Sequence, residues 1–455
     1  MRTDMRTDIA PYTNRCTALL KQMHAQGGGV AVLATSPEMT RNNDCFFPFR
    51  HDSYFYYLTG FTEPEAVVVL VAAEKNQRIL FCREKNIERE IWEGFRYGPQ
   101  AAQTQFGFDA AFPIEQLEPE LTNLLSNAPI LFHTQGYNGQ LDTQLQRCIT
   151  TLLGRARSGV LPPPHMMNLH AMLNEMRLIK DSDEIALMQR AASISALAHQ
   201  RAMKIAKPGM FEYELEAELL HEFRRQGAQA PAYNSIVAAG ANSCVLHYNA
   251  NNARIKDGDL VLIDAGCEFD SYASDVTRTF PVNGKFSAPQ QALYELVLAA
   301  QTAALAHAKI GARYQDGHHA AIRVLTQGML DTGLLDKNKV GSLDDAITNT
   351  AYRQFYMHGT GHWIGMDVHD VGYYRDASAP ATTEERPYRQ LQAGMAITIE
   401  PGIYVRPAEG VPEQFWHIGI RIEDDIVITE HGPLNLSRET PKTVAEIEAI
   451  MKMGT

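Results

Sequence analysis

Residues 259–280 read Asp-Leu-Val-Leu-Ile-Asp-Ala-Gly-Cys-Glu-Phe-Asp-Ser-Tyr-Ala-Ser-Asp-Val-Thr-Arg-Thr-Phe, two apolar stretches joined by a polar one. The alternation of apolar side chains predicts two adjacent strands. A turn centred on Phe269 and Asp270 would pair them as a hairpin and set Asp264 directly opposite Asp275. We therefore expect an antiparallel sheet with two acids on one face.

Two carboxylates in such a pair repel each other, because directly opposed Cβ atoms lie only about 4.5–5.5 Å apart. Either one acid holds a proton at a raised pKa, or a cation sits between them. The alternative is structural: Asp264 caps a turn and Asp275 faces water.

Two further acids end apolar stretches in the same half of the chain. Glu400 ends a stretch that begins at Met395, and Pro401 is expected to stop pairing there. Glu423 ends a second stretch, on the same face as Arg421. Either acid alone is compatible with an ordinary surface position, but four strand-borne acids favour one shared site.

Residues 358–370 read His-Gly-Thr-Gly-His-Trp-Ile-Gly-Met-Asp-Val-His-Asp. The glycines permit close approach and unusual backbone angles, so this segment is expected to be a shaped loop and not a helix. The HExxH pattern of zinc proteases is absent. A structural role is open for each of His358, His362 and His369, but we expect at least one of them to bind a metal.

The candidate ligand set is Asp264, Asp275, His362, Glu400 and Glu423. Its four negative charges balance two divalent cations. Oxygen-rich sites suit Mn²⁺ or Mg²⁺, and the ligand types alone leave Zn²⁺ and Co²⁺ open. We expect two divalent metal ions, with Mn²⁺ as the first choice.

The length of 455 residues exceeds what one hydrophobic core usually serves, so two domains are expected. Short β-rich runs alternate with helix-compatible segments in the first third, which predicts an α/β domain; the runs are residues 30–34, 66–73, 79–82 and 130–133. The glycine- and proline-rich residues 158–165 precede the boundary, giving domains 1–175 and 176–455.

The second domain is expected to open with a long helix, because Asp181 and Glu184 are spaced as a capping box. Residues 290–310 have similar helical spacing. Strands are predicted at residues 259–265, 273–280, 395–400 and 418–428.

Composition excludes several other classes of protein. The net charge of -12 argues against nucleic acid as a partner. The longest apolar run, residues 66–73, is too short to cross a bilayer, and residues 1–15 lack the apolar core of a secretory signal. Six scattered cysteines form no CxxC pair, and Gly27 to Gly29 belong to no phosphate-binding motif. A cytoplasmic protein with reduced thiols is expected.

The strings around the five candidate ligands resemble those of the pita-bread metallopeptidases, and within that group the Xaa-Pro aminopeptidases. The similarity extends to residues 57–66 and to Met-Arg-Leu-Ile-Lys at 176–180, and so to nearly the whole chain. It implies a creatinase-like α/β N-terminal domain, followed by a pseudo-twofold α+β pita-bread catalytic domain. It also implies that Asp275 and Glu423 bridge the metals, with Asp264 on one metal and His362 and Glu400 on the other.

The resemblance further implies roles for residues around the metals. Glu400 would shuttle a proton, and His369 and His247 would steady the oxyanion and the following carbonyl. The substrate pocket would be lined by His247, His358, His369, Tyr404 and Arg421. Trp92 would reach a neighbouring subunit's active site, which implies a homo-oligomer, a dimer or a tetramer.

The implied activity is hydrolysis of the first peptide bond of peptides with proline in second position, by a hydroxide that bridges the two metals. Prolidase, which shares the ligands but cleaves only dipeptides, is the nearest alternative. Creatinase shares the architecture without metal, and a binding-only pita-bread protein is expected to have lost ligands. The five intact ligand positions argue against both.

Overall fold

The computed structural model describes residues 8–380 and 386–453. The chain forms two compact units, Met1–Glu175 (the N-terminal unit) and Met176–Thr455 (the C-terminal unit). The first seven residues of the expected signal-free N-terminus lie outside the described part. No helix formed by residues 8–380 and 386–453 combines the length and apolar character needed to span a bilayer.

The N-terminal unit is built on a mixed six-stranded sheet in the order β6-β5-β4-β1-β7-β8. Its strands are β1 (Gly29–Ala34), β4 (Val67–Ala72), β5 (Gln77–Cys82), β6 (Ala110–Pro113), β7 (Ile130–Phe132) and β8 (His165–Met167). The four predicted strands are confirmed as β1, β4, β5 and β7. The two edge strands, Ala-Ala-Phe-Pro and His-Met-Met, were not predicted, because they contain no β-branched residue.

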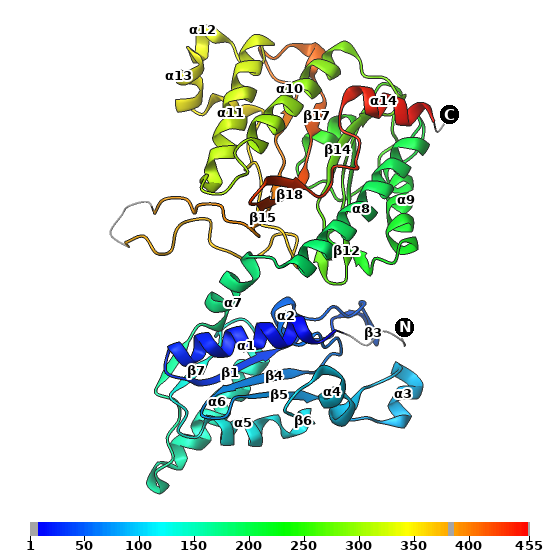
Figure 1. Ribbon diagram of the computed structural model, residues 1–455. Coiled ribbons are helices and arrows are strands. Elements are labelled where there is room, and N and C mark those ends of the chain that lie inside the picture. Colours follow the sequence, from blue (N-terminus) through cyan, green and yellow to red (C-terminus); the bar gives the residue numbers. More distant parts are fainter. Residues whose placement is uncertain (1–7, 381–385, 454–455) are drawn as a thin grey trace. The chain divides into compact units, whose positions relative to one another are not determined.

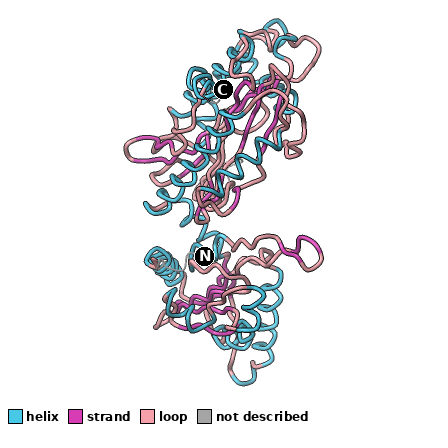
Figure 2. The backbone as a smooth tube through the Cα atoms, turned by 90° about the vertical axis from the view of Figure 1, so that its right-hand side faces the viewer, coloured by secondary structure: helices cyan, strands magenta, loops and turns pink. Residues whose placement is uncertain are grey.

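Helices cover both faces of this sheet (Figure 1). Alternate valines such as Val30 and Val32 pack with the leucines of α5 (Leu117–Leu125) and α6 (Gly139–Gly154). On the opposite face lie α1 (Ala10–Ala25) and α2 (Ser53–Thr59). The remaining elements are α3 (Ile87–Glu93), α4 (Gly98–Phe106), α7 (Leu169–Leu178) and the protruding hairpin of β2 (Thr40–Asn42) and β3 (Cys45–Phe46), seen in Figure 2.

In the C-terminal unit, a helix pair followed by antiparallel strands occurs twice. The pairs are α8 (Ser182–Ile205) with α9 (Glu212–Arg225), and α10 (Ala288–Leu305) with α11 (Tyr314–Asp331). The predicted capping box is confirmed: Asp181 Oδ1 accepts hydrogen bonds from the backbone N–H groups of Asp183 (3.0 Å) and Glu184 (2.9 Å). The second long helix ends at Leu305, before the predicted residue 310.

The strands of this unit form small antiparallel sheets. They are β10 (Ile236–Ala239), β11 (Leu260–Asp264) and β14 (Thr277–Pro281); β9 (Ala230–Pro231), β12 (Cys267–Phe269) and β13 (Tyr272–Ala273); β15 (Ala396–Ile399), β18 (Asp424–Thr429) and β19 (Gly432–Asn435); and β16 (Gly402–Val405) with β17 (Ile418–Arg421). The last helix is α14 (Val444–Lys452). One large apolar core joins strands and helices.

The predicted register of the first hairpin is wrong by two residues. Asp264 pairs with Thr277 and not with Asp275, because the turn is centred on Asp270 and Ser271, whose φ angles are 45° and 70°. A shift of two residues keeps every side chain on its predicted face. Asp264 and Asp275 are therefore diagonal neighbours on the same face.

The single strand predicted over residues 418–428 is also wrong. It is interrupted after Arg421, and its two parts belong to different sheets, since β17 pairs with β16 and β18 with β15. Pairing does not stop for long after Glu400 either, because β16 begins at Gly402. These two interruptions place Glu400 and Glu423 between sheets.

Candidate metal centre and active site

One cavity of the C-terminal unit, of about 470 Å³, brings the five candidate ligands together. Its lining includes Asp264, Asp275, His362, Glu400 and Glu423, along with His247, His358, His369, Arg421 and Tyr233. Both arms of the first hairpin, the histidine-rich loop and the two strand interruptions therefore meet in one place.

Tyr233 joins the two acids of the first hairpin. Its hydroxyl lies 2.6 Å from Asp264 Oδ1 and also within hydrogen-bonding reach of Asp275 Oδ1. Burial and the neighbouring carboxylates raise the pKa of Tyr233 well above its usual value. The phenol therefore stays protonated and acts as a donor between the two acids.

Arg421 supplies a fixed positive charge beside Asp264. Its Nη2 lies 2.6 Å from Asp264 Oδ2, and its Nη1 donates to the Tyr404 hydroxyl at 2.9 Å. Burial nevertheless raises the pKa of Asp264, against the opposing effect of Arg421. One guanidinium is thus not enough to neutralise the acids of the cavity.

Glu423 reaches the cavity because the chain after β17 runs against β14. The backbone N–H of Glu423 donates to the Thr277 carbonyl at 3.1 Å, and the Thr277 hydroxyl donates to Glu423 Oε2 at 2.6 Å. Burial and repulsion by Asp275 and Glu400 raise the pKa of Glu423 well above its usual value. A proton or a metal ion has to offset this buried charge.

His362 and Glu400 meet because the histidine-rich loop runs antiparallel to β15. The Thr398 N–H donates to the His362 carbonyl at 2.9 Å, and the Glu400 N–H donates to the Thr360 carbonyl at 2.8 Å. A Cβ at Gly361 would lie 2.0 Å from the Thr398 carbonyl oxygen, so only glycine fits there. The glycine is required by this close backbone contact.

The imidazole of His362 is aimed into the acidic cluster. Its Nε2 lies 3.4 Å from Asp275 Oδ2 and 3.9 Å from Glu400 Oε1, while Nδ1 lies 3.0 Å from the Trp363 carbonyl oxygen. A histidine held through Nδ1 in this way leaves Nε2 for a metal.

The pKa shifts of His362 and Glu400 indicate that the cluster favours added positive charge. Burial opposes an imidazolium, yet the hydrogen bond and charge of Asp275 raise the pKa of His362 to about 9. Burial also raises the pKa of Glu400 to about 7. Burial would raise the pKa of Asp275 as well, but His362 holds it below its usual range.

The donor set fits a divalent cation. Ligand atoms of Asp275, His362 and Glu423 all lie within 4.8 Å of one another. Carboxylate oxygens and one imidazole nitrogen are donors that Mn²⁺ and Zn²⁺ both accept. The raised pKa values of His362, Glu400 and Glu423 indicate that the cluster favours added positive charge, which a divalent cation would supply.

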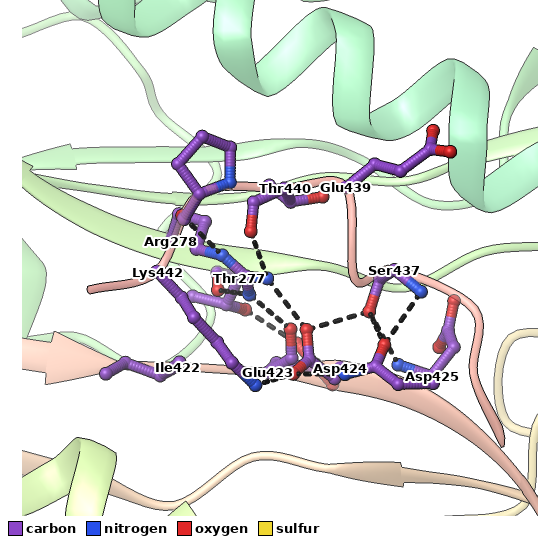
Figure 3. Close-up of polar contacts among 12 residues, drawn as sticks. Thr277, Arg278, Ile422, Glu423, Asp424, Asp425, Ser437, Glu439, Thr440 and Lys442 are labelled. Carbon is purple, nitrogen blue, oxygen red and sulfur yellow. Dashed lines mark hydrogen bonds and ion pairs between the residues drawn. The ribbon is translucent and has the colours of Figure 1, made fainter. Parts of the chain in front are cut away.

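A buried polar network holds the backbone around Glu423 (Figure 3). Arg278 donates to the Glu423 carbonyl at 2.6 Å and to Asp424 Oδ1 at 2.7 Å, and Lys442 donates to Asp424 Oδ2 at 2.6 Å. Asp425 accepts a hydrogen bond from the Asp275 N–H at 2.9 Å. Of these three consecutive acids, only Glu423 lines the cavity, whereas Asp424 and Asp425 belong to the network that supports it.

The other predicted site residues fall into three groups. His247, His358, His369 and Arg421 line the cavity. Tyr404 does not, contrary to expectation: it is 1% exposed and lies behind the lining residues, with its hydroxyl 2.8 Å from His358 Nε2. Trp92 lies on α3 of the N-terminal unit and is 85% exposed, and its role at a neighbouring subunit's active site stays a prediction.

Two residues of the site were missed by sequence reasoning. Thr277 lies two positions after Asp275, on the same strand face, so periodicity alone could have identified it. Tyr233 carries no local signal, because it lies 31 residues before Asp264 and meets it only in the folded chain.

Comparison with known proteins agrees with this geometry. Residues 186–430 match metallopeptidase family M24, and residues 12–132 match the aminopeptidase P N-terminal domain. The chain is 43% identical to the Xaa-Pro aminopeptidase of Escherichia coli, covering 97% of each chain. It is 35% identical to Xaa-Pro aminopeptidase 3 of Rattus norvegicus, covering 96% of this chain and 85% of the relative.

Solved structures show the same likeness. The aminopeptidase PepP of Pseudomonas aeruginosa superposes with a TM-score of 0.94 at 47% identity, covering 98% of each chain. A variant of Escherichia coli aminopeptidase P in complex with substrate gives 0.93 at 42% identity, again covering 98% of each chain.

The chain therefore belongs to metallopeptidase family M24. Within that family it belongs with the Xaa-Pro aminopeptidases, the aminopeptidase P group, and it is a metallo-aminopeptidase, a hydrolase. The predicted fold class, a creatinase-like α/β domain followed by a pita-bread catalytic domain, is confirmed.

Proposed function

We propose that this enzyme removes the N-terminal residue from peptides whose second residue is proline. The observation that carries the proposal is the convergence of Asp264, Asp275, His362, Glu400 and Glu423 in one cavity of a chain whose relatives are Xaa-Pro aminopeptidases.

Asp275 and Glu423 would be shared by two metal ions, with Asp264 on one ion and His362 and Glu400 on the other. Support comes from the direction of His362 Nε2 and from Tyr233 and Arg421, which orient Asp264 from the side. Two divalent ions, Mn²⁺ first, would supply a water of lowered pKa and an electrophile for the carbonyl oxygen.

The chain's own residues would bind the peptide and move protons. The acids of the cavity attract a cationic N-terminus. The Glu400 carboxylate would accept a proton from the attacking water and pass it to the proline nitrogen as that nitrogen leaves. His369 and His247 would donate to the reacting carbonyl oxygen and to the next carbonyl.

Proline recognition would depend on shape, because the bond to proline is a tertiary amide without an N–H. His358 would form the wall against the ring. The Tyr404 hydroxyl lies 2.8 Å from His358 Nε2 and accepts from Arg421, so it fixes the orientation of this wall from behind.

A cytoplasmic homo-oligomer, a dimer or a tetramer, is part of the proposal. The helix α3 exposes three large apolar side chains, Ile87 (75%), Ile91 (77%) and Trp92 (85%), which favours burial against another subunit. All six cysteines are free thiols in the described chain, as a reducing compartment would require.

The test is to dialyse the enzyme against chelator, restore Mn²⁺ and assay three peptides. An Xaa-Pro-Yaa tripeptide should be cleaved only with metal, and an Xaa-Ala-Yaa tripeptide should be cleaved poorly. Cleavage restricted to the Xaa-Pro dipeptide would indicate prolidase. Glu423→Ala should abolish activity, while Glu430→Ala, at an exposed acid just beyond β18, should not. Full activity after metal removal would refute the proposal.

A further inference from the structure

A buried ion cluster lies directly behind the segment that carries His369. Arg177 Nη2 is 2.7 Å from Asp367 Oδ2 and 2.7 Å from Asp370 Oδ1, and Lys180 Nζ is 2.8 Å from Asp370 Oδ2. The side chains of Arg177, Lys180 and Asp370 are each 1% exposed. Both cations belong to the Met-Arg-Leu-Ile-Lys sequence that opens the C-terminal unit.

His369 sits between the two acids held by Arg177. Its own ring is exposed to the cavity and makes no hydrogen bond to any residue in the described part of the chain. Its ring centroid lies 4.1 Å from that of His362. The position of His369 is therefore set mainly by its backbone, which Asp367 and Asp370 fix on either side.

The segment is closed tightly around the cluster. The Asp370 N–H donates to the Trp363 carbonyl at 2.8 Å, which closes a loop over residues 363–370. A Cβ at Gly365 would lie 2.2 Å from Asp370 Oδ2 and 2.8 Å from Lys180 Cε. The backbone at Gly365 therefore packs directly against Asp370 and Lys180, and only glycine fits there.

Building on the proposed function, we infer that Lys180 and Arg177 are positioning residues for His369. Two cations hold one buried carboxylate, and that carboxylate holds the backbone of the adjacent histidine over the reacting carbonyl. Loss of Lys180 leaves Arg177 as the one cation beside Asp370. A buried carboxylate that has lost a cation is destabilised and is expected to shift to a position where water can solvate it. The loop then loosens, and His369 moves away from its site.

A double-variant cycle tests this coupling. Lys180→Met should lower kcat on an Xaa-Pro-Yaa tripeptide about 10- to 100-fold, the range expected for a misplacement of about 1 Å. Metal content per subunit should stay at the wild-type value. In a His369→Ala background the same change should alter kcat less than about twofold, because the group it positions is gone. An equal loss in both backgrounds would overturn the inference.

A control and a second readout separate this outcome from general damage. Lys204→Met removes an exposed lysine of α8 and should leave kcat unchanged. Amide hydrogen exchange of residues 364–370 should accelerate in Lys180→Met and not in Lys204→Met, whatever peptide the enzyme cleaves. Unchanged hydrogen exchange in Lys180→Met would also overturn the inference. Failure of the proposed function is a separate outcome: the wild-type enzyme would then show no metal-dependent cleavage of the tripeptide. Should Lys180→Met not fold, Asp370→Asn takes its place in the cycle.

Discussion

Arg278→Met should destabilise the C-terminal unit strongly. Arg278 is fully buried, and each of its three nitrogens donates, to Asp424 Oδ1 and to four backbone carbonyls, which are those of Pro441, Thr277, Glu423 and Thr440. Methionine fills a similar volume without donors. Asp424, also fully buried, then keeps Lys442 as its remaining cation.

The expected magnitude follows from these contacts. Removing one partner of a buried ion pair costs about 3–5 kcal/mol, and the remaining Lys442 favours the lower end. The carbonyls that lose a donor add about 1 kcal/mol, and the Thr277 carbonyl still accepts from the Glu423 N–H. We expect a loss of about 4 kcal/mol in the free energy of unfolding, or about 10 °C in Tm for a unit of this size.

The assay is thermal and urea unfolding of the metal-free variant and wild type, followed by tryptophan fluorescence, because Trp363 and Trp416 lie in this unit. Arg323→Met is the matched control: Arg323 lies 2.9 Å from Asp344, with side chains 61% and 80% exposed, so its loss should cost less than about 1 kcal/mol. If both variants unfold within about 2 °C of wild type, the reasoning on Arg278 is refuted.

Three further predictions concern the site and the assembly. Burial raises the pKa of Glu400 to about 7, so in the metal-free protein the contribution of Glu400 to stability is complete at low pH and is lost as the pH rises through 7. Mn²⁺ should therefore raise Tm more at pH 8 than at pH 5.5. Equal shifts of Tm at the two pH values in a fluorescence melt would contradict this prediction. Tyr404→Phe removes the hydroxyl that hydrogen-bonds to both His358 and Arg421. It should lower kcat/KM on an Xaa-Pro-Yaa tripeptide about tenfold, with metal content unchanged. Wild-type kinetics of this variant would exclude a role of the hydroxyl in orienting the pocket. Trp92→Ala should lower kcat/KM, because Trp92 is 85% exposed in the single chain and is proposed to contact another subunit. A Trp92→Ala variant with wild-type kcat/KM, or a wild-type enzyme that is a fully active monomer in light scattering, would refute the proposed subunit contact.

Local patterns in the sequence predicted the elements well. The capping box at Asp181 and Glu184 depends on residues three apart, and the apolar alternation of β1, β4, β5 and β7 depends on residues two apart. The same alternation placed Asp264 and Asp275 on one face of the hairpin. It could not set their register, because that depends on which residues adopt positive φ in the turn, and Asp270 and Ser271 gave no sharper signal than their neighbours.

The sequence by itself determined the chemistry of this protein. It showed which residues offer metal ligands, how many negative charges have to be neutralised, and which family has similar sequence motifs. Only the tertiary structure decided which groups meet. Thr277 supports Glu423 from 146 residues away, Tyr233 bridges two acids from 31 and 42 residues away, and Tyr404 stands behind the pocket instead of in its wall. The physical reason is that propensity and periodicity act over a few residues, whereas the positions of buried charges depend on how distant strands pack.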